Sequence, residues 1–120
     1  MTLNLVIPAR NEAAHLARIL RLAHAALPPS ALLVLADSAS NDNTVEVVNA
    51  LMLELPKLRL VRATASGKGR AIRTGWEAYP ADRLAFMDAD LATDLEALPR
   101  LVEGLATADV VIGSRRHPNS

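Results

Sequence analysis

Short apolar runs alternate along the chain with longer stretches in which apolar residues recur every three or four positions. Runs of the first kind are typical of buried strands, and the second periodicity is typical of amphipathic helices. The runs predict strands at residues 3–7, 32–36, 58–62, 83–87 and 109–112. The periodic stretches predict helices at residues 12–26, 44–55, 70–79 and 94–105. Because strands that alternate with helices form βαβ units, we predict an α/β fold with a mostly parallel sheet of about five strands and helices on both faces.

The fourth predicted strand ends in two aspartates, Asp88 and Asp90, which are separated by Ala89. Side chains along an extended chain alternate between two faces, so both carboxylates can point to the same side. Two like charges at the end of a buried strand repel each other. The arrangement is tolerable when a divalent cation or a polar substrate lies between them. Ligands of open α/β sheets bind at this carboxyl edge. The segment therefore predicts a metal-bound, oxygen-rich ligand, with a phosphorylated nucleotide as the first candidate.

Other predicted strands also end in polar residues. Arg10 follows the first strand, Asp37 the second and Arg115 the fifth. An arginine at a strand end can bind phosphate, and a carboxylate there can accept hydrogen bonds from a base or a ribose hydroxyl. Each position also has a simpler interpretation. Asn11 can cap the first helix beside Arg10, Asp37 can bond its own turn, and Arg115 can lie in a solvated basic turn.

A lysine between two glycines precedes the third predicted helix, in the segment 66–70. Glycines allow a ligand to approach the backbone closely, and helix N-termini attract anions. The segment is not a Walker A loop, because Arg62 stands where that motif needs a glycine. A lysine in a solvated loop is the simpler interpretation of Lys68. One shared ligand nevertheless explains all these polar groups at one sheet edge better than separate explanations do.

Composition narrows the function further. A chain of 120 residues is one domain or part of one. Lys plus Arg and Asp plus Glu both number 13, so the formal net charge is zero, which argues against a general nucleic-acid binder. The chain has no cysteine, which excludes disulfides and thiolate metal sites. It shows neither a basic leader nor an apolar stretch near the roughly 20 residues of a transmembrane helix, so we expect a cytoplasmic protein.

Five motifs follow one another along the chain, at residues 6–12, 37–44, 67–69, 88–90 and 113–115. In order and approximate spacing they resemble the motifs of the family 2 glycosyltransferases, which have the GT-A fold. The aspartate pair and its flanks, with the preceding Gly-Lys-Gly loop, are most similar to the polyprenyl-phosphate (dolichyl-phosphate) sugar transferases. The resemblance implies an enzyme that transfers a hexose from a UDP- or GDP-linked sugar to an acceptor. That acceptor could be a polyprenyl phosphate, which would place the enzyme at the cytoplasmic face of a membrane.

The same resemblance implies a role for each matched position. The residues along the nucleotide would be Pro8, Ala9, Arg10, Glu12, Asp37, Ser38, Lys68, Gly69 and Arg115. Among these, Asp37 would bind the base and Arg115 a phosphate. Asp88 would contact the ribose or the donor sugar. Asp90 would hold Mg²⁺ or Mn²⁺ between the two phosphates, so the DXD motif from Asp88 through Ala89 to Asp90 would be both the metal site and the catalytic pair.

Two positions depart from the pattern of the family. Ala39 stands where a glycine usually follows the acidic residues of the second motif, and Asn43 stands where a glycine usually precedes Thr44. Asparagine tolerates a positive φ, whereas alanine is accommodated there less easily. These departures bear on the detailed shape of the nucleotide loop more than on the fold.

Family domains extend well past the fifth strand. The resemblance therefore implies that residues 1–120 are the nucleotide-sugar-binding portion of a transferase domain, truncated after Ser120. Such a portion leaves a second function open, namely a non-catalytic module that binds a nucleotide sugar and lacks the acceptor half. We also expect it to form homo-oligomers at high concentration, because self-association would cover the apolar edge that the other half would otherwise bury.

Two other enzyme or signalling classes fit less well. A receiver domain has about this length and strand number, but it needs an acidic pair after the first strand, where this chain has Pro8, Ala9 and Arg10. A phosphatase of the haloacid dehalogenase type needs its paired aspartates near the first strand, and here they follow the fourth.

Overall fold

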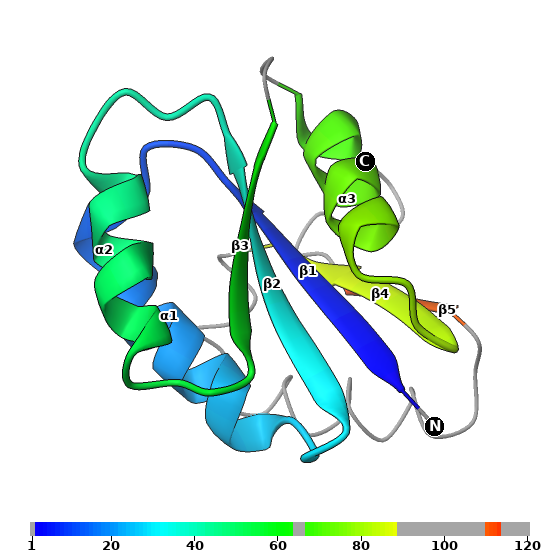
Figure 1. The fold of residues 1–120 in the computed structure, drawn as a ribbon. Helices are drawn as coiled ribbons and strands as arrows, with labels where there is room; N and C mark the ends of the chain where they lie inside the picture. The colour runs from blue at the N-terminus through cyan, green and yellow to red at the C-terminus, as the bar shows by residue number, and fades with distance from the viewer. Residues whose placement is uncertain (1, 64–66, 89–109, 114–120) are drawn as a thin grey trace.

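The computed structural model describes residues 2–63, 67–88 and 110–113. Within these residues, five strands and three helices follow one another (Figure 1). In chain order they are β1 (Leu3–Ala9), α1 (Ala13–Ala26), β2 (Ala31–Ser38), α2 (Thr44–Met52), β3 (Leu58–Ala63), α3 (Lys68–Ala78), β4 (Arg83–Met87) and β5 (Val110–Gly113). None of the helices in the described ranges is both long and apolar enough to cross a membrane.

The strands form one parallel sheet in the order β3-β2-β1-β4-β5. α1 and α2 lie on one side of the sheet and α3 lies on the other (Figure 1). Parallel strands need crossover connections, and these are right-handed, so the helices change face when the direction of travel across the sheet reverses after β3. The structure thus confirms the α/β class, the parallel sheet and the helices on both faces.

Element boundaries differ from the predicted ones by at most three residues, and β4 agrees at both ends. β1 and β2 each run two residues further, to Ala9 and Ser38, and Ala9 pairs with Asp37. α3 begins two residues early, at Lys68, and α2 ends three residues early, at Met52. The helix predicted at residues 94–105 lies outside the described residues. The longer strands place the second motif directly at the sheet edge.

The core lies on both faces of β1 and β2, because these two strands are covered by helices on each side. Leu5, Ile7 and Leu35 belong to the larger cluster, which packs α1 and α2 on one face. Val6 and Val34 belong to the smaller cluster, which packs α3 on the other face. Continuous apolar sequence is typical of parallel strands buried on both faces, and it is what made these runs easy to recognise as strands.

α3 lies unusually close to β1 through one glycine and one asparagine. A Cβ atom at Gly75 would lie 2.8 Å from Val6 Cγ2, so the absence of a side chain lets the helix backbone approach the strand. The fully buried Asn4 side chain donates from Nδ2 to the carbonyls of Gly75, at 3.1 Å, and Tyr79, at 2.8 Å. These contacts hold α3 over the sheet with its N-terminal residue, Lys68, above the carboxyl edge.

Candidate functional site

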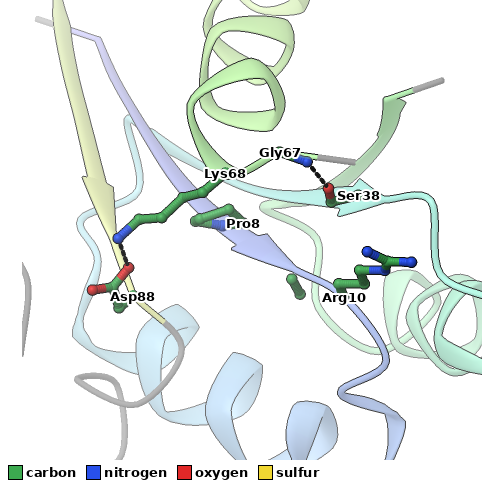
Figure 2. Close-up of a pocket in the computed structure, with 7 residues that line it drawn as sticks. Pro8, Arg10, Ser38, Gly67, Lys68 and Asp88 are labelled. Atoms are coloured by element: carbon green, nitrogen blue, oxygen red, sulfur yellow. Dashed lines mark hydrogen bonds and ion pairs between the residues drawn. The ribbon is translucent and has the colours of Figure 1, made fainter. Parts of the chain in front are cut away.

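A cavity of about 210 Å³ opens at the carboxyl edge of the sheet, where β1, β2 and β4 end and α3 begins (Figure 2). Four segments that are far apart in the sequence supply its walls. The lining residues are Pro8, Ala9, Arg10, Ser38, Gly67, Lys68 and Asp88. The structure therefore brings together most of the described residues that the strand-end argument selected.

The end of β1 forms the floor of this cavity. Pro8 is partly exposed and Ala9 is buried, and together they present a small apolar surface. Arg10 follows the strand and is exposed. Figure 2 shows Arg10 on one side of Pro8, with Lys68 and Asp88 on the other. The cavity thus has cationic side chains on two sides of an apolar floor.

Lys68 and Asp88 form an ion pair at one edge of the cavity. The lysine side chain extends from the start of α3, past Pro8, to the carboxylate at the end of β4 (Figure 2). Its Nζ atom lies 5.5 Å from the centre of the Phe86 ring, which adds a cation–π contact. The lysine side chain is 48% exposed, whereas the aspartate side chain is 16% exposed. The carboxylate is therefore the more fixed partner.

Gly67 joins the start of α3 to the end of β2. Its N–H donates a hydrogen bond of 3.0 Å to Ser38 Oγ (Figure 2). Gly67 has a φ of 135°, a backbone conformation that residues other than glycine rarely adopt. The Ser38 hydroxyl can still donate its own proton, because its oxygen is the acceptor in this bond. Ser38 thus both anchors Gly67, the residue before Lys68, and lines the cavity.

Asp37 is fully buried at the end of β2 but does not line the cavity. Its Oδ2 accepts a long hydrogen bond of 3.4 Å from the Ser40 N–H and lies 3.9 Å from Arg62 Nε. Its Oδ1 has no hydrogen-bond partner in the described part of the chain. The contact with its own turn agrees with the simpler interpretation of Asp37. A buried carboxylate oxygen without a partner is costly, and the turn alone leaves it unexplained.

The loops after β1 and β2 are joined by contacts that sequence reasoning missed. The N–H of Asn11 donates to Ser40 Oγ at 2.9 Å, and Asn11 Oδ1 accepts from the Asn41 N–H at 3.0 Å. Asn11 has a φ of 53° and is not the cap of α1; Glu12 holds that position, without a side-chain cap bond. The signal that could have revealed these contacts is the adjacency of β1 and β2, because neighbouring parallel strands bring their following loops together.

The remaining predicted site residues lie elsewhere or are not described. Glu12 is the N-cap residue of α1, and its carbonyl accepts the N–H groups of residues 15 and 16. Gly69 lines a second cavity, of about 360 Å³, between α3 and β4, together with Lys68, Ile72, Arg73, Trp76 and Phe86. Ala89, Asp90 and Arg115 lie outside the described residues.

The surroundings of Asp88 fit a divalent cation in part. Asp88 offers carboxylate oxygens, which Mg²⁺ and Mn²⁺ prefer as ligands. Its carboxylate also pairs with one cation of the protein itself, the Lys68 ammonium. Among the described residues, however, no group of three or more His, Cys, Asp or Glu side chains is placed to hold a metal. Asp88 could therefore serve only as one ligand among several, with other oxygens coming from a bound diphosphate or from residues outside the described ranges.

Comparisons with known proteins agree with this architecture. The family model described as glycosyl transferase family 2 matches residues 4–120. An undecaprenyl-phosphate mannosyltransferase from Micrococcus luteus is 40% identical over 119 residues, which covers 94% of this chain and 48% of the relative. A dolichol-phosphate mannosyltransferase from Pyrococcus furiosus is 30% identical, covering 96% of this chain and 33% of the relative. The chain thus spans about half of these curated relatives, or less.

Solved structures show the same fold. A mannosyltransferase from Pyrobaculum calidifontis, in complex with GDP-Man and Mn²⁺, superposes with a TM-score of 0.67 at 28% identity over 73% of this chain and 27% of that one. S. aureus TarS in complex with UDP superposes with a TM-score of 0.64 at 20% identity, over 75% of this chain and 28% of that one, a likeness of fold alone. These neighbours are GT-A glycosyltransferases. With the family model matched from the first strand to the last residue, the chain belongs to glycosyl transferase family 2, a family of enzymes.

Proposed function

We propose that this chain binds the nucleotide part of a UDP- or GDP-linked sugar in the cavity at the carboxyl edge. The observation that carries the proposal is the convergence of Arg10, Ser38, Lys68 and Asp88 on one cavity in a chain of this family. Ligands of open α/β sheets bind at this edge. Support for the nucleotide comes from the neighbours, which were solved with GDP-Man and with UDP.

The cavity residues suggest how a nucleoside diphosphate would lie. The apolar surface of Pro8 and Ala9 suits the base and ribose, and the Ser38 hydroxyl can donate to a ligand oxygen. Arg10 and Lys68 supply positive charge for the phosphates, and the N-terminus of α3 adds the positive end of the helix dipole. We assign to Asp37 a hydrogen bond with the base, because such a bond would give its unpartnered Oδ1 a donor.

The proposed reaction is transfer of a hexose from the nucleotide to a polyprenyl phosphate. An oxygen of the acceptor phosphate forms a bond to the anomeric carbon, and the bond from that carbon to the nucleoside diphosphate breaks. Since the acceptor phosphate is already anionic, no general base is needed to deprotonate it. A divalent cation held through Asp88 and Asp90 would neutralise charge on the leaving diphosphate. The lipid acceptor is proposed from the names of the relatives, which act on undecaprenyl and dolichol phosphates.

Nucleotide binding can be tested by thermal shift and calorimetric titration with GDP, UDP and ADP, each with Mn²⁺ or with a chelator. A ligand that binds only the folded state raises the melting temperature. We expect GDP or UDP to raise it more in the presence of Mn²⁺. We expect Asp37→Asn to weaken binding by roughly 5- to 150-fold, the range that about 1–3 kcal/mol corresponds to for a hydrogen bond with a charged group.

Asp82→Asn is the matched control, because this exposed carboxylate lies at the opposite edge of the sheet, where it bonds Thr2. Equal affinity in the unmutated protein and in Asp37→Asn would contradict the role of Asp37. Failure of all three nucleotides to bind would contradict the proposed function itself. Transfer of label from a GDP- or UDP-sugar to undecaprenyl phosphate separates an enzyme from a module that only binds the nucleotide.

A further inference from the structure

The second cavity, of about 360 Å³ between α3 and β4, lies beside the cavity assigned to the nucleotide. Its described lining consists of Lys68, Gly69, Ile72, Arg73, Trp76 and Phe86. Two of these residues carry a positive charge, three are aliphatic or aromatic, and none is acidic. Binding sites for small molecules commonly have this character, a mostly apolar wall with a few polar groups that orient the ligand. Of this set, the proposed nucleotide site uses Lys68 alone.

The apolar wall of the second cavity comes from Ile72 and Trp76 on α3 and from Phe86 on β4. The rings of Trp76 and Phe86 lie 6.3 Å apart, centre to centre, at an angle of 56°. The polar atom of the indole ring, Nε1, donates a hydrogen bond of 2.9 Å to the carbonyl of Ala85. A ligand in this cavity therefore meets apolar ring surface, which suits a hydrocarbon chain better than a polar group.

The lining changes from charged to apolar along α3. Lys68, Ile72 and Trp76 recur every four residues, so they lie one above another on one face of the helix. Lys68 begins α3 at the carboxyl edge, next to the nucleotide cavity, and Trp76 stands roughly 12 Å further along the helix axis. One end of the second cavity is thus cationic and close to the nucleotide, and its apolar wall extends away from that end.

Arg73 is the cation that the two cavities do not share. It is exposed, and within the described residues no carboxylate pairs with it. Lys68, in contrast, pairs with Asp88 at the boundary of the first cavity (Figure 2). A guanidinium can bind a phosphate through two parallel N–H donors, so Arg73 suits a phosphate group at this wall. An anion held there lies next to the nucleotide cavity, because Lys68 lines both cavities.

We propose that the cavity between α3 and β4 binds the lipid-phosphate acceptor. The phosphate pairs with Arg73 beside Lys68. The first units of the isoprenoid chain pack against Ile72, Trp76 and Phe86. An amphiphile with an anionic head matches both parts of the lining, whereas a free anion leaves the apolar wall in water and a neutral lipid leaves the cations unused. This proposal rests on the proposed function, from which it takes the class of the acceptor.

The test uses farnesyl phosphate, a short isoprenoid phosphate, below the concentration at which it forms micelles. Trp76 is the single tryptophan of the sequence and lines the cavity, so its fluorescence reports on occupancy. We expect a saturable blue shift of the emission, because the chain displaces water from the indole ring. Farnesol, which lacks the phosphate, should bind roughly tenfold more weakly, and inorganic phosphate should leave the emission unchanged.

Arg73→Gln removes the charge and should weaken the binding of farnesyl phosphate roughly tenfold, with the affinity for farnesol unchanged. Arg70→Gln is the matched control, because Arg70 is also an exposed cation of α3 but belongs to neither described lining. Equal losses in the two variants would assign the effect to net charge and overturn the proposal. Equal affinities for farnesol and farnesyl phosphate, or a blue shift with inorganic phosphate alone, would overturn it as well.

Calorimetric titration of the same protein with GDP and UDP separates this proposal from the proposed function. If a nucleotide binds and farnesyl phosphate does not, the acceptor site is wrong and the nucleotide site stands. If farnesyl phosphate binds with the expected dependence on Arg73 and no nucleotide binds, the second cavity is a lipid-phosphate site and the proposed nucleotide function is wrong.

Discussion

Ala39 is held in a left-handed conformation, with a φ of 54°, directly after β2. In this conformation the Cβ atom of an L-residue crowds its carbonyl oxygen, and the crowding costs roughly 1–2 kcal/mol. The loop nevertheless keeps it, because Ser40 is bonded on one side to Asp37 and on the other to Asn11. Asn43, the other position at which the family usually has glycine, has an ordinary φ of −90°. Of these two positions, the strain in the loop after β2 therefore lies at residue 39.

Replacement of Ala39 by glycine is expected to stabilise the protein. Glycine removes the steric cost of the left-handed conformation but adds conformational freedom to the unfolded chain, so we expect a net gain of about 1 kcal/mol in the free energy of unfolding. Urea denaturation followed by circular dichroism measures it. Asn43→Gly is the control and should lower the free energy of unfolding, because its φ needs no glycine. A gain for Asn43→Gly equal to that for Ala39→Gly would contradict this account.

At the scale of elements, His24 connects the end of α1 to the turn before β3. Its Nε2 accepts the N–H of Lys57 at 3.2 Å, while Lys57 Nζ donates to the carbonyl of Leu27 at 2.7 Å. Burial, and then the nearby charge of Lys57, hold the pKa of the His24 imidazole below its usual value of 6.5. The bond to Lys57 needs an unprotonated Nε2, so the folded protein favours neutral His24.

This preference predicts a pH dependence of stability. Below pH 6.5 the unfolded chain binds a proton at His24 that the folded chain resists, so stability falls as the pH drops from 6.5 through the lowered pKa of the folded state. Above pH 6.5 the contribution of His24 is constant. We expect His24→Gln to lose less stability than the unmutated protein between pH 7.5 and pH 5.5, measured by urea denaturation at both. Identical losses in the two proteins would show that other groups cause the dependence.

The packing of α3 on the sheet gives a second prediction at this scale. A methyl group at residue 75 would lie 2.8 Å from Val6 Cγ2 and 3.4 Å from Val34 Cγ1, and both valines are stiff and fully buried. We expect Gly75→Ala to lower the free energy of unfolding by about 1–3 kcal/mol, the usual cost of overpacking, despite the better helix propensity of alanine.

Gly69→Ala is the matched control on the same helix. A Cβ at residue 69 would have no neighbour within 4 Å, and the residue is exposed. Its substitution should leave stability unchanged or raise it by up to about 1 kcal/mol, through helix propensity. Thermal unfolding measures the stability of both variants. If Gly75→Ala is as stable as Gly69→Ala, the space between α3 and β1 is not too small for a methyl group at residue 75.

At the scale of the whole molecule, the two core clusters share the sheet as their common layer. The larger cluster joins α1 and α2 to β1 and β2, and the smaller one joins α3 to the other face of the same strands. Trp76, the single tryptophan of the sequence, lies beside the smaller cluster, where its Nε1 donates to the carbonyl of Ala85 at 2.9 Å. Its fluorescence therefore reports on the α3 face alone, while circular dichroism reports on all helices.

We predict that unfolding is cooperative across both faces. Because β1 and β2 carry both clusters, neither face can lose its packing while the other keeps it, and the urea transitions of Trp76 fluorescence and far-ultraviolet circular dichroism should coincide. Transitions with separate midpoints would mean that the α3 face unfolds independently. In that case α3, with Lys68 at its start, could detach from the sheet without global unfolding, and the proposed affinity for nucleotide should depend on that local equilibrium.

Much of the fold and part of the site followed from the sequence, because the signals that carry them are local. Periodicity within ten or so residues identified the strands and helices, and the parallel βαβ arrangement brings all strand ends to one edge whatever their order. That is why Arg10 and Lys68 could be assigned to one site together with Asp88, whereas Ser38 was implied by the family resemblance alone. The limits of the elements were predicted less well, since strand and helix ends depend on tertiary contacts such as the pairing of Ala9 with Asp37.

Only the tertiary structure decided the features that depend on residues far apart in the chain. The bonds from Asn4 to Gly75 and Tyr79 span 71 and 75 residues, and they fix α3 over the sheet, where its first residue, Lys68, pairs with Asp88. The contact between Asn11 and Ser40 crosses from one loop to the next, and with it the left-handed residue is Ala39 instead of Asn43. No pattern within a single segment encodes such contacts, because their free energy arises only once the sheet has assembled. The sequence by itself determined which strands and helices form and that the strand ends share one edge, and the assembled fold determined which side chains meet there.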